Sequence, residues 1–314
     1  MKYLNDFANE IIKSKDSADS LIIYKNGHGY IVNKKREDVF DVRSISKTVL
    51  SLACGILINK NPEDFNLETN IYPIIKDKIN LTNTKNLRYL KEINVGHLLT
   101  HTTGYRDLVL LSKDLREKDY DQLVDYIINY PIYYIPGSYF LYSNAGYYLL
   151  ALTMQEFLNY DLLDFIYENL FKPLDIPYRN WDRFGNHIAG ATKLQSSAYD
   201  LLKIGKLILN KGKYNGMQIV SEDYIKLMQE PLKKNRHESK REFVSEDYYG
   251  LGLWISEANV IFASGTGGQL IVILKDLDIV IVTTNNGSDS KSYKIKADAD
   301  ELIKLIYREN NHGL

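Results

Sequence analysis

The order of two kinds of segment limits the fold of this chain more than any single motif does. Short apolar runs that are typical of strands lie near both ends, whereas all seven prolines fall between Pro62 and Pro231. Proline lacks the backbone N–H and disrupts helix and strand interiors, so it divides the middle into separate elements. We therefore expect an α/β fold of the α+β type, with an antiparallel sheet built from both chain ends, flanking helices, and an inserted, mostly helical region.

Apolar periodicity predicts the individual elements. One pair of strands is joined by Asn26-Gly27, a typical hairpin turn, and another by a tight turn over 275–278. The stretch 44–59 is apolar nearly all round, which suits a helix buried on most sides. The predicted strands are 21–24, 30–33, 249–255, 260–264, 270–274 and 279–283. The predicted helices are 3–13, 44–59, 145–158, 161–171, 197–210 and 295–308.

This pattern also predicts how the chain is divided. Residues 1–60 plus 231–314 are expected to form an α/β sheet domain, and residues 61–230 are expected to form a helical region. The site is expected to lie in the cleft between them. The charged run over 233–241 is interpreted as a solvated loop.

The composition limits the classes of molecule that this chain is expected to bind. With 314 residues, 45% of them apolar, the chain can bury a sizeable core, and its single cysteine, Cys54, cannot form an internal disulfide. A net charge of −1 gives no bulk attraction to nucleic acid or an anionic membrane. No stretch approaches the ~20 apolar residues of a membrane span, and the N-terminus lacks the apolar core of a signal peptide. We expect a cytoplasmic protein that acts on a small molecule without a cofactor, in an oligomeric state that the sequence leaves open.

Ser44 and Lys47 have the S-x-x-K spacing. Positions i and i+3 share a helix face, so the hydroxyl and the amine can meet, and burial would lower the pKa of the amine enough to make it a base. A helix N-terminus also offers unpaired N–H groups that favour an oxyanion. The alternative is a plain helix cap. The same spacing recurs at Ser288 and Lys291 in a polar loop, where we interpret it as chance.

Tyr142 and Asn144 form a second candidate pair. The Y-x-N pattern occurs five times, but this copy follows a Pro136-Gly137 turn and leads into a predicted helix. In an extended segment both side chains point to the same side, and a phenol beside a lysine can act as base and then as acid. The alternative is a tyrosine packed under a loop.

The stretch 263–269, Ala-Ser-Gly-Thr-Gly-Gly-Gln, lies on and after a predicted strand. Glycines let a backbone approach a ligand closely, and an exposed strand N–H can supply half of an oxyanion hole. The alternative is a glycine bulge between strands.

His97 and His101 are spaced i, i+4 on a predicted helix, as two metal ligands can be. No acidic third ligand is apparent nearby. We therefore favour packing or capping for both residues and expect no metal.

Taken together and in this order, the segments resemble the serine β-lactamase and penicillin-binding protein superfamily. The most similar branch is the class C β-lactamase-related one, with its esterases, D-aminopeptidases and amide hydrolases. The resemblance covers most of the chain and includes His-Leu-Leu-Thr-His-Thr-Thr-Gly at 97–104 and Tyr-Gly-Leu-Gly-Leu-Trp at 249–254. It implies a β-lactamase-like fold.

The resemblance also implies roles for the candidate residues. Ser44 matches the nucleophile and Lys47 the lysine beside it. Tyr142 matches the tyrosine base, and Asn144 the asparagine that steadies the substrate and the lysine. The oxyanion hole would consist of the N–H groups of Ser44 and Thr266.

At Ala263 the sequence departs from the family pattern. Family members carry Lys-Thr-Gly or His-Thr-Gly on the edge strand of the sheet, and here Ala263, Ser264 and Gly265 match that triplet. Alanine cannot provide the charge-assisted hydrogen bond, typically worth ~1.5–3 kcal/mol, by which a basic residue helps to hold a substrate carboxylate. This argues against efficient β-lactam hydrolysis.

These inferences predict a serine hydrolase that acts on a small ester or amide through an acyl-enzyme formed by Ser44, Lys47 and Tyr142. Within the enzymes, the alternative is a β-lactamase, a D-Ala-type carboxypeptidase or a D-aminopeptidase. The alternative from another class is a non-catalytic ligand-binding or sensing module on the same fold.

Overall fold

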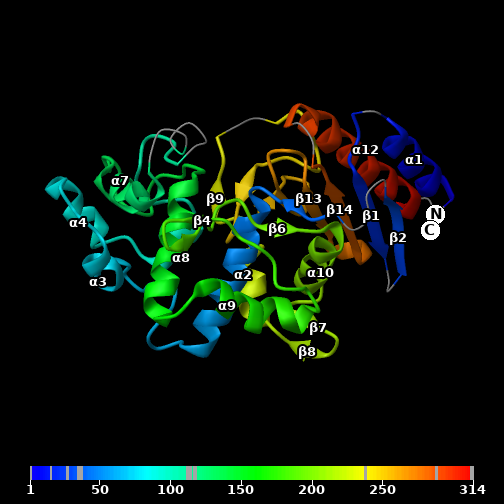
Figure 1. Ribbon diagram of the computed structural model, residues 1–314. Coiled ribbons are helices and arrows are strands. Elements are labelled where there is room, and N and C mark those ends of the chain that lie inside the picture. The colour runs from blue at the N-terminus through cyan, green and yellow to red at the C-terminus, as the bar shows by residue number, and fades with distance from the viewer. Residues whose placement is uncertain are drawn as a thin grey trace.

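An eight-stranded antiparallel sheet forms the centre of the computed structural model, which describes residues 2–14, 16–25, 28–33, 38–110, 115, 119–236, 239–286 and 289–311. The strand order is β2-β1-β14-β13-β12-β11-β10-β9 (Figure 1). The bounds are β1 Ser20–Lys25, β2 His28–Asn33, β9 Lys233–Lys234, β10 Tyr248–Tyr249, β11 Trp254–Ile255, β12 Ile261–Ser264, β13 Leu270–Leu274 and β14 Ile279–Thr284.

Both chain ends contribute to this sheet, as the sequence predicts. β1 pairs with β2 on one side and with β14 on the other, where Ser20 lies opposite Thr284. The predicted hairpin between β13 and β14 is present, and its turn ends at Asp278 in the left-handed conformation. Asn26 and Gly27 lie outside the described residues, although the strands that flank them do pair.

Helices cover both faces of the sheet (Figure 1). On one face, α1 (Lys2–Lys13) and α12 (Ser292–Asn311) pack beside each other on the outward side chains of β13 and β14. On the opposite face lie α2 (Ile45–Lys60) and α10 (Ala198–Leu209). Because both faces are covered, the strands β13 and β14 are buried along their full length.

The position of α10 refines the predicted division of the chain. It falls within the range assigned to the helical region, yet it packs on β1, β13 and β14. A side chain at Gly205 would come within 2.8 Å of both Val280 and Ile271, so glycine lets the helix approach the sheet closely. The domain boundaries themselves stay a prediction.

Most of the remaining elements form the helical region on the other side of α2. The longest helix of this region is α8 (Asn144–Leu158), in which residues 145–154 are buried and Asn144 is half-buried. The predicted helix over 161–171 is α9 (Leu162–Ile166), continued by a π-helical turn. The shorter helices are α3 Tyr72–Ile75, α4 Leu87–Leu90, α5 Val95–Leu99, α7 Leu123–Asn129 and α11 Glu222–Met228. Three two-stranded ribbons pair β3 Phe40–Asp41 with β6 Gln195–Ser196, β4 Arg183–Phe184 with β5 His187–Ile188, and β7 Lys213–Tyr214 with β8 Met217–Gln218.

The prediction of one strand over 249–255 is wrong. The segment forms two short strands, β10 and β11, which pair with each other across a turn. Gly252 has φ +84°, and a side chain on it would lie 2.8 Å from Ser51 Cβ on α2. A side chain on Gly250 would likewise collide with the Met228 carbonyl. The chain therefore turns here because two glycines allow close contact with neighbouring backbone.

None of the helices in the described ranges is long and apolar enough to cross a membrane.

Candidate active site

Ser44 occupies the N-cap position of α2, but its side chain does not cap the helix. Its hydroxyl instead lies 3.2 Å from the Lys47 ammonium nitrogen, Nζ. The preceding residue, Arg43, has φ +55°, a left-handed conformation that is unfavourable for a residue with a side chain. The turn that precedes Ser44 is thus strained. It holds the partly exposed Ser44 beside the buried Lys47.

Lys47 is completely buried. Its Nζ is within hydrogen-bond distance of three neutral oxygens: Ser44 Oγ, Asn144 Oδ1 at 2.9 Å and the Ala191 carbonyl at 3.0 Å. Burial without a compensating carboxylate lowers the pKa of Lys47 to about 7. At neutral pH a large share of this amine is therefore uncharged, with a lone pair free to accept a proton from Ser44.

Asn144 and Tyr142 complete the surroundings of that amine. Asn144 begins α8, and while its Oδ1 accepts from Lys47, its Nδ2 donates to the Leu110 carbonyl at 3.0 Å. Leu110 has φ +65°, so a second strained residue fixes this amide. The Lys47 nitrogen lies 4.8 Å from the centre of the Tyr142 ring. Burial raises the pKa of Tyr142 above the usual phenol range, and a hydrogen bond with Ser44 opposes that shift in part.

His101 lies against this centre, but not where the helical spacing predicts it. α5 ends at Leu99, and His101 follows it with φ +55°, so the prediction that both histidines lie on one helix is wrong. His97 forms a capping box with Asn94 at the start of α5, which is one of the two roles that the sequence favours. No group of three metal-ligating side chains occurs in the part of the chain that the structure describes.

The buried His101 ring supports the Tyr142 segment. Its Nδ1 accepts from the Ser143 N–H at 3.3 Å, and its ring centre lies 4.5 Å from that of Tyr142 and 4.8 Å from that of Tyr249. Burial, together with the Lys47 charge, holds the pKa of His101 well below its usual range, so the ring is neutral. Its Nε2 has no hydrogen-bond partner among the described residues. Sequence reasoning missed this contact, for which a spacing pattern gives no signal.

The end of β12 lies next to the residues that precede Ser44. A side chain on Gly265 would lie 2.9 Å from the Val42 carbonyl and 3.2 Å from Arg43 Cβ, so the 265–268 turn adjoins the residues before Ser44. In the described ranges, neither the Ser44 N–H nor the Thr266 N–H donates to another residue. Both groups are therefore available to an oxyanion.

β12 is not an edge strand, contrary to the sequence prediction. It lies between β11 and β13, although β11 pairs only with Ile261 and Phe262. Ala263 and Ser264 therefore pair on one side only. Only the last two residues of β12 therefore have an unpaired side, as the edge-strand prediction expected for the whole strand.

The Ser264 hydroxyl is engaged with a residue that the sequence did not single out. It donates to Glu246 Oε1 at 3.2 Å, and the same oxygen receives Lys296 from α12 at 3.1 Å. This end of β12 thus presents a carboxylate paired with a lysine. The two residues are far apart in the sequence, and no motif contains them.

Comparison with known proteins identifies the family of this chain. The profile of the Beta-lactamase family matches residues 19–304, which is most of the chain. The chain belongs to the Beta-lactamase family.

Solved structures share the Beta-lactamase fold of this chain. An octameric penicillin-binding protein homologue from Pyrococcus abyssi has 20% identity and a TM-score of 0.73, with 98% of this chain and 80% of that chain covered. A protein assigned as a 6-aminohexanoate-dimer hydrolase from Bacillus anthracis has 19% identity and a TM-score of 0.71, with coverages of 97% and 82%. EstCE1, a hydrolase with promiscuous acyltransferase activity, has 16% identity and a TM-score of 0.69, with coverages of 95% and 97%.

Proposed function

We propose that this chain is a serine hydrolase that cleaves a small ester or amide through an acyl-enzyme on Ser44. The observation that carries the proposal is the buried Lys47 amine, which has a pKa of about 7 and lies 3.2 Å from the Ser44 hydroxyl. A serine becomes a strong nucleophile only when a base takes its proton, and an uncharged amine at this distance can do so. Family membership and the hydrolases among the structural neighbours support the same class of reaction.

In the first step, Ser44 Oγ attacks the carbonyl carbon of the substrate while its proton moves to Lys47 Nζ. The carbonyl oxygen becomes an oxyanion, which the N–H groups of Ser44 and Thr266 are free to receive. Such donors stabilise the charge that develops, and removing one typically costs about 10²–10³-fold in rate. The Asn144 side chain keeps the amine aimed at Ser44 throughout.

In the second step, the leaving group needs a proton. Tyr142 is protonated at neutral pH because burial raises its pKa, so its phenol can donate rather than accept. The Ser44 side chain acts on the phenol by lowering its pKa in part, and we take this proximity to link Tyr142 to the proton held by Lys47. We assign the base role to Lys47 and the proton relay to Tyr142. Water then attacks the acyl-enzyme by the same route in reverse and releases Ser44.

Labelling with an active-site fluorophosphonate tests the proposal. Wild type should be labelled and should hydrolyse p-nitrophenyl esters, whereas Ser44→Ala should do neither and should keep its thermal unfolding temperature. Ser288→Ala is the matched control, because it alters the second S-x-x-K copy and should label normally. Labelling and turnover of Ser44→Ala at the wild-type level would refute the proposal.

The same preparations separate the alternatives. Rapid, saturable nitrocefin turnover would identify a β-lactamase and would contradict the weight given to Ala263. Release of D-amino acids from their amides would identify a D-aminopeptidase. Stable acylation of Ser44 with no turnover on any ester would instead indicate a sensing module.

A further inference from the structure

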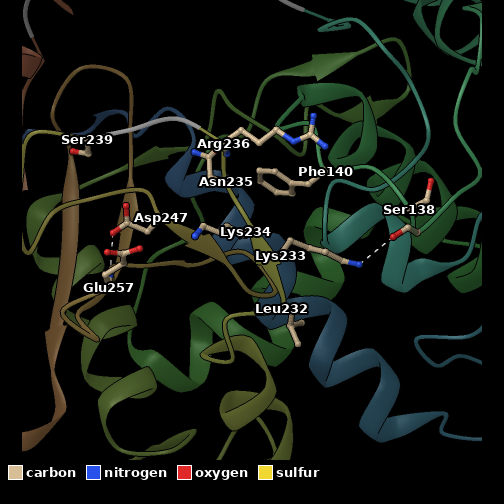
Figure 2. A pocket seen from close by; sticks show the side chains of 11 residues that line it. Ser138, Phe140, Leu232, Lys233, Lys234, Asn235, Arg236, Ser239, Asp247 and Glu257 are labelled. Atoms are coloured by element: carbon tan, nitrogen blue, oxygen red, sulfur yellow. Dashed lines mark hydrogen bonds between the residues drawn. The ribbon is translucent and has the colours of Figure 1, made fainter.

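A large cavity opens next to the candidate active site. Its volume is about 840 Å³, and it lies between the loop over 137–140 and the edge strand β9 with the residues that follow it. Figure 2 shows Asp247 and Glu257 on one side of the cavity and Phe140 and Arg236 on the other, with Lys234 between them. The lining is mostly polar or charged, so the cavity suits a polar ligand.

Three cations line this cavity, and none of them has a carboxylate within ion-pair distance in the part of the chain that the structure describes. Lys233 donates to the Gly137 carbonyl at 3.1 Å and so ties β9 to the loop that leads to Tyr142. Lys234 and Arg236 have no carboxylate within ion-pair distance among the described residues. Their nearest aromatic rings are Tyr248, 5.8 Å from Lys234 Nζ, and Tyr139, 4.9 Å from the Arg236 guanidinium. A ring face attracts a cation without neutralising it, so both charges remain available.

The acidic residues across the cavity do not cancel this charge. Asp247 is satisfied by neutral donors, the Ser245 hydroxyl at 2.6 Å and the Glu257 N–H at 2.8 Å. Glu257 is exposed to solvent. An anion entering the cavity is therefore attracted to the wall that carries Arg236 and repelled by the wall that carries Glu257, which fixes the side on which it binds.

A chain of rings connects the cavity to the reaction centre. Phe140 lines the cavity, its ring centre lies 6.3 Å from that of Trp254, and Trp254 lies 5.0 Å from Tyr142. The loop over 137–140 lines the cavity and leads directly to Tyr142, so a substrate with its carbonyl at Ser44 would extend along this loop toward the cavity. The charged end must be several bonds from the carbonyl, because two ring contacts separate the places.

We infer that this cavity binds a carboxylate on the far end of the substrate, held by Lys234 and Arg236; the inference rests on the proposed function. The substrate carboxylate would then bind in the cavity and not at the end of β12, where position 263 is alanine and Ser264 donates to Glu246. The substrate class is a linear ester or amide with a carboxylate several bonds from the cleaved carbonyl.

Two matched substrate pairs test this inference. The first compares the p-nitrophenyl monoester of adipic acid with that of adipic acid monoamide, so that only the acyl arm changes charge. The second compares butyrate esters of para-hydroxybenzoate and para-hydroxybenzamide, so that only the departing arm changes. In at least one pair, wild type should show a KM about tenfold lower for the anionic member, as expected for one charge-assisted hydrogen bond.

Variants identify the residues responsible. Lys234→Gln and Arg236→Gln should each reduce the preference for the anion, and the double variant should abolish it, with kcat/KM for the neutral esters within about twofold of wild type. Glu257→Gln should shift the preference in the opposite direction. Lys226→Gln, an exposed cation on α11, is the control for net charge and should change nothing.

The outcomes separate this inference from the proposed function. If neutral esters turn over through Ser44 but wild type shows no preference, or the double variant keeps it, the cavity does not recognise carboxylates. If no ester turns over, the proposed function fails, and calorimetry with adipic acid monoamide decides about the cavity. Equal affinity of wild type and the double variant would then overturn the inference, whereas loss of affinity in the double variant would support it.

Discussion

We propose different roles for two lysines in neighbouring parts of this molecule. At the start of α2, Lys47 is fully buried among neutral acceptors and its pKa is lowered to about 7, so it can exchange protons near neutral pH. On β9, Lys234 is exposed at the edge of a wide cavity, in contact with water. Burial converts the first lysine into a base, and exposure suits the second to recognition. Residue type alone does not distinguish the two roles.

The largest difference between the two lysines is expected when each of them is replaced by glutamine. Lys47→Gln should lower kcat/KM for a neutral ester by about 10²–10⁴-fold, the usual contribution of a general base. The protein should stay folded, because glutamine avoids burying an amine that can take up a charge. Lys234→Gln, measured on the same ester, should differ from wild type by less than about twofold. Similar losses in both variants would remove the distinction between the two sites.

The pH dependence sharpens the comparison. Because the pKa of Lys47 is lowered to about 7, the amine is protonated below that pH and cannot accept the serine proton. We expect kcat/KM for a neutral ester to fall about tenfold per pH unit below pH 7 and to level off above it. A profile that stays flat from pH 5 to pH 9 would show that Lys47 is not the base.

His101 tests whether the buried centre depends on its supporting ring. His101→Phe keeps a ring but removes the acceptor of the Ser143 N–H, a loss that should lower the free energy of unfolding by about 1–3 kcal/mol. The kcat should also fall, because Tyr142 and Asn144 flank that N–H, while the pH midpoint should not move, since the ring is neutral.

Tyr105→Phe is the control for this variant. It removes a buried hydrogen bond to the Ile127 carbonyl away from the reaction centre, and it should destabilise the protein without lowering kcat. If both variants lose only stability, His101 does not position the catalytic segment.

The smallest effect is expected at Cys54, two turns along α2 from Lys47. Burial raises the pKa of this thiol to about 12, so the reactive thiolate is nearly absent at neutral pH. An aromatic disulfide reagent should leave the folded protein unmodified and should react fully in denaturant. Rapid labelling of the folded protein would mean that the interior of α2 is more accessible than the structure indicates.

The sequence predicts the contacts that depend on local spacing. Ser44 and Lys47 meet because i and i+3 share a helix face. The approach of Asn144 to Lys47 depends on the packing of α8 against α2, and the resemblance to a known family, rather than spacing, suggested it. The sheet built from both chain ends also follows from the sequence, because all the strands predicted from it lie outside the proline-rich middle.

Contacts that depend on backbone turns could not be predicted in this way. His97 and His101 have helical spacing, but the Asn94 capping box and the left-handed His101 confine the helix to five residues. Gly250 and Gly252 break a run that looks like one strand, and the reason lies in α2 and α11, far away in the chain. Glu246 and Lys296 meet only after the sheet and α12 have packed together. Each of these errors arises where tertiary packing overrides a local pattern.

The pairing of β1 with β14 affects how the protein can be made. β1 and the apolar α2 leave the ribosome early, whereas β14, which lies between β1 and β13, is among the last segments to emerge. Segments between them can begin to fold during synthesis, because many of their contacts are local. Ser44 meets the 265–268 turn only once nearly the whole chain is available. A nascent chain released early would therefore expose apolar surface and carry no hydrolytic activity, so the cell would have to protect or degrade it.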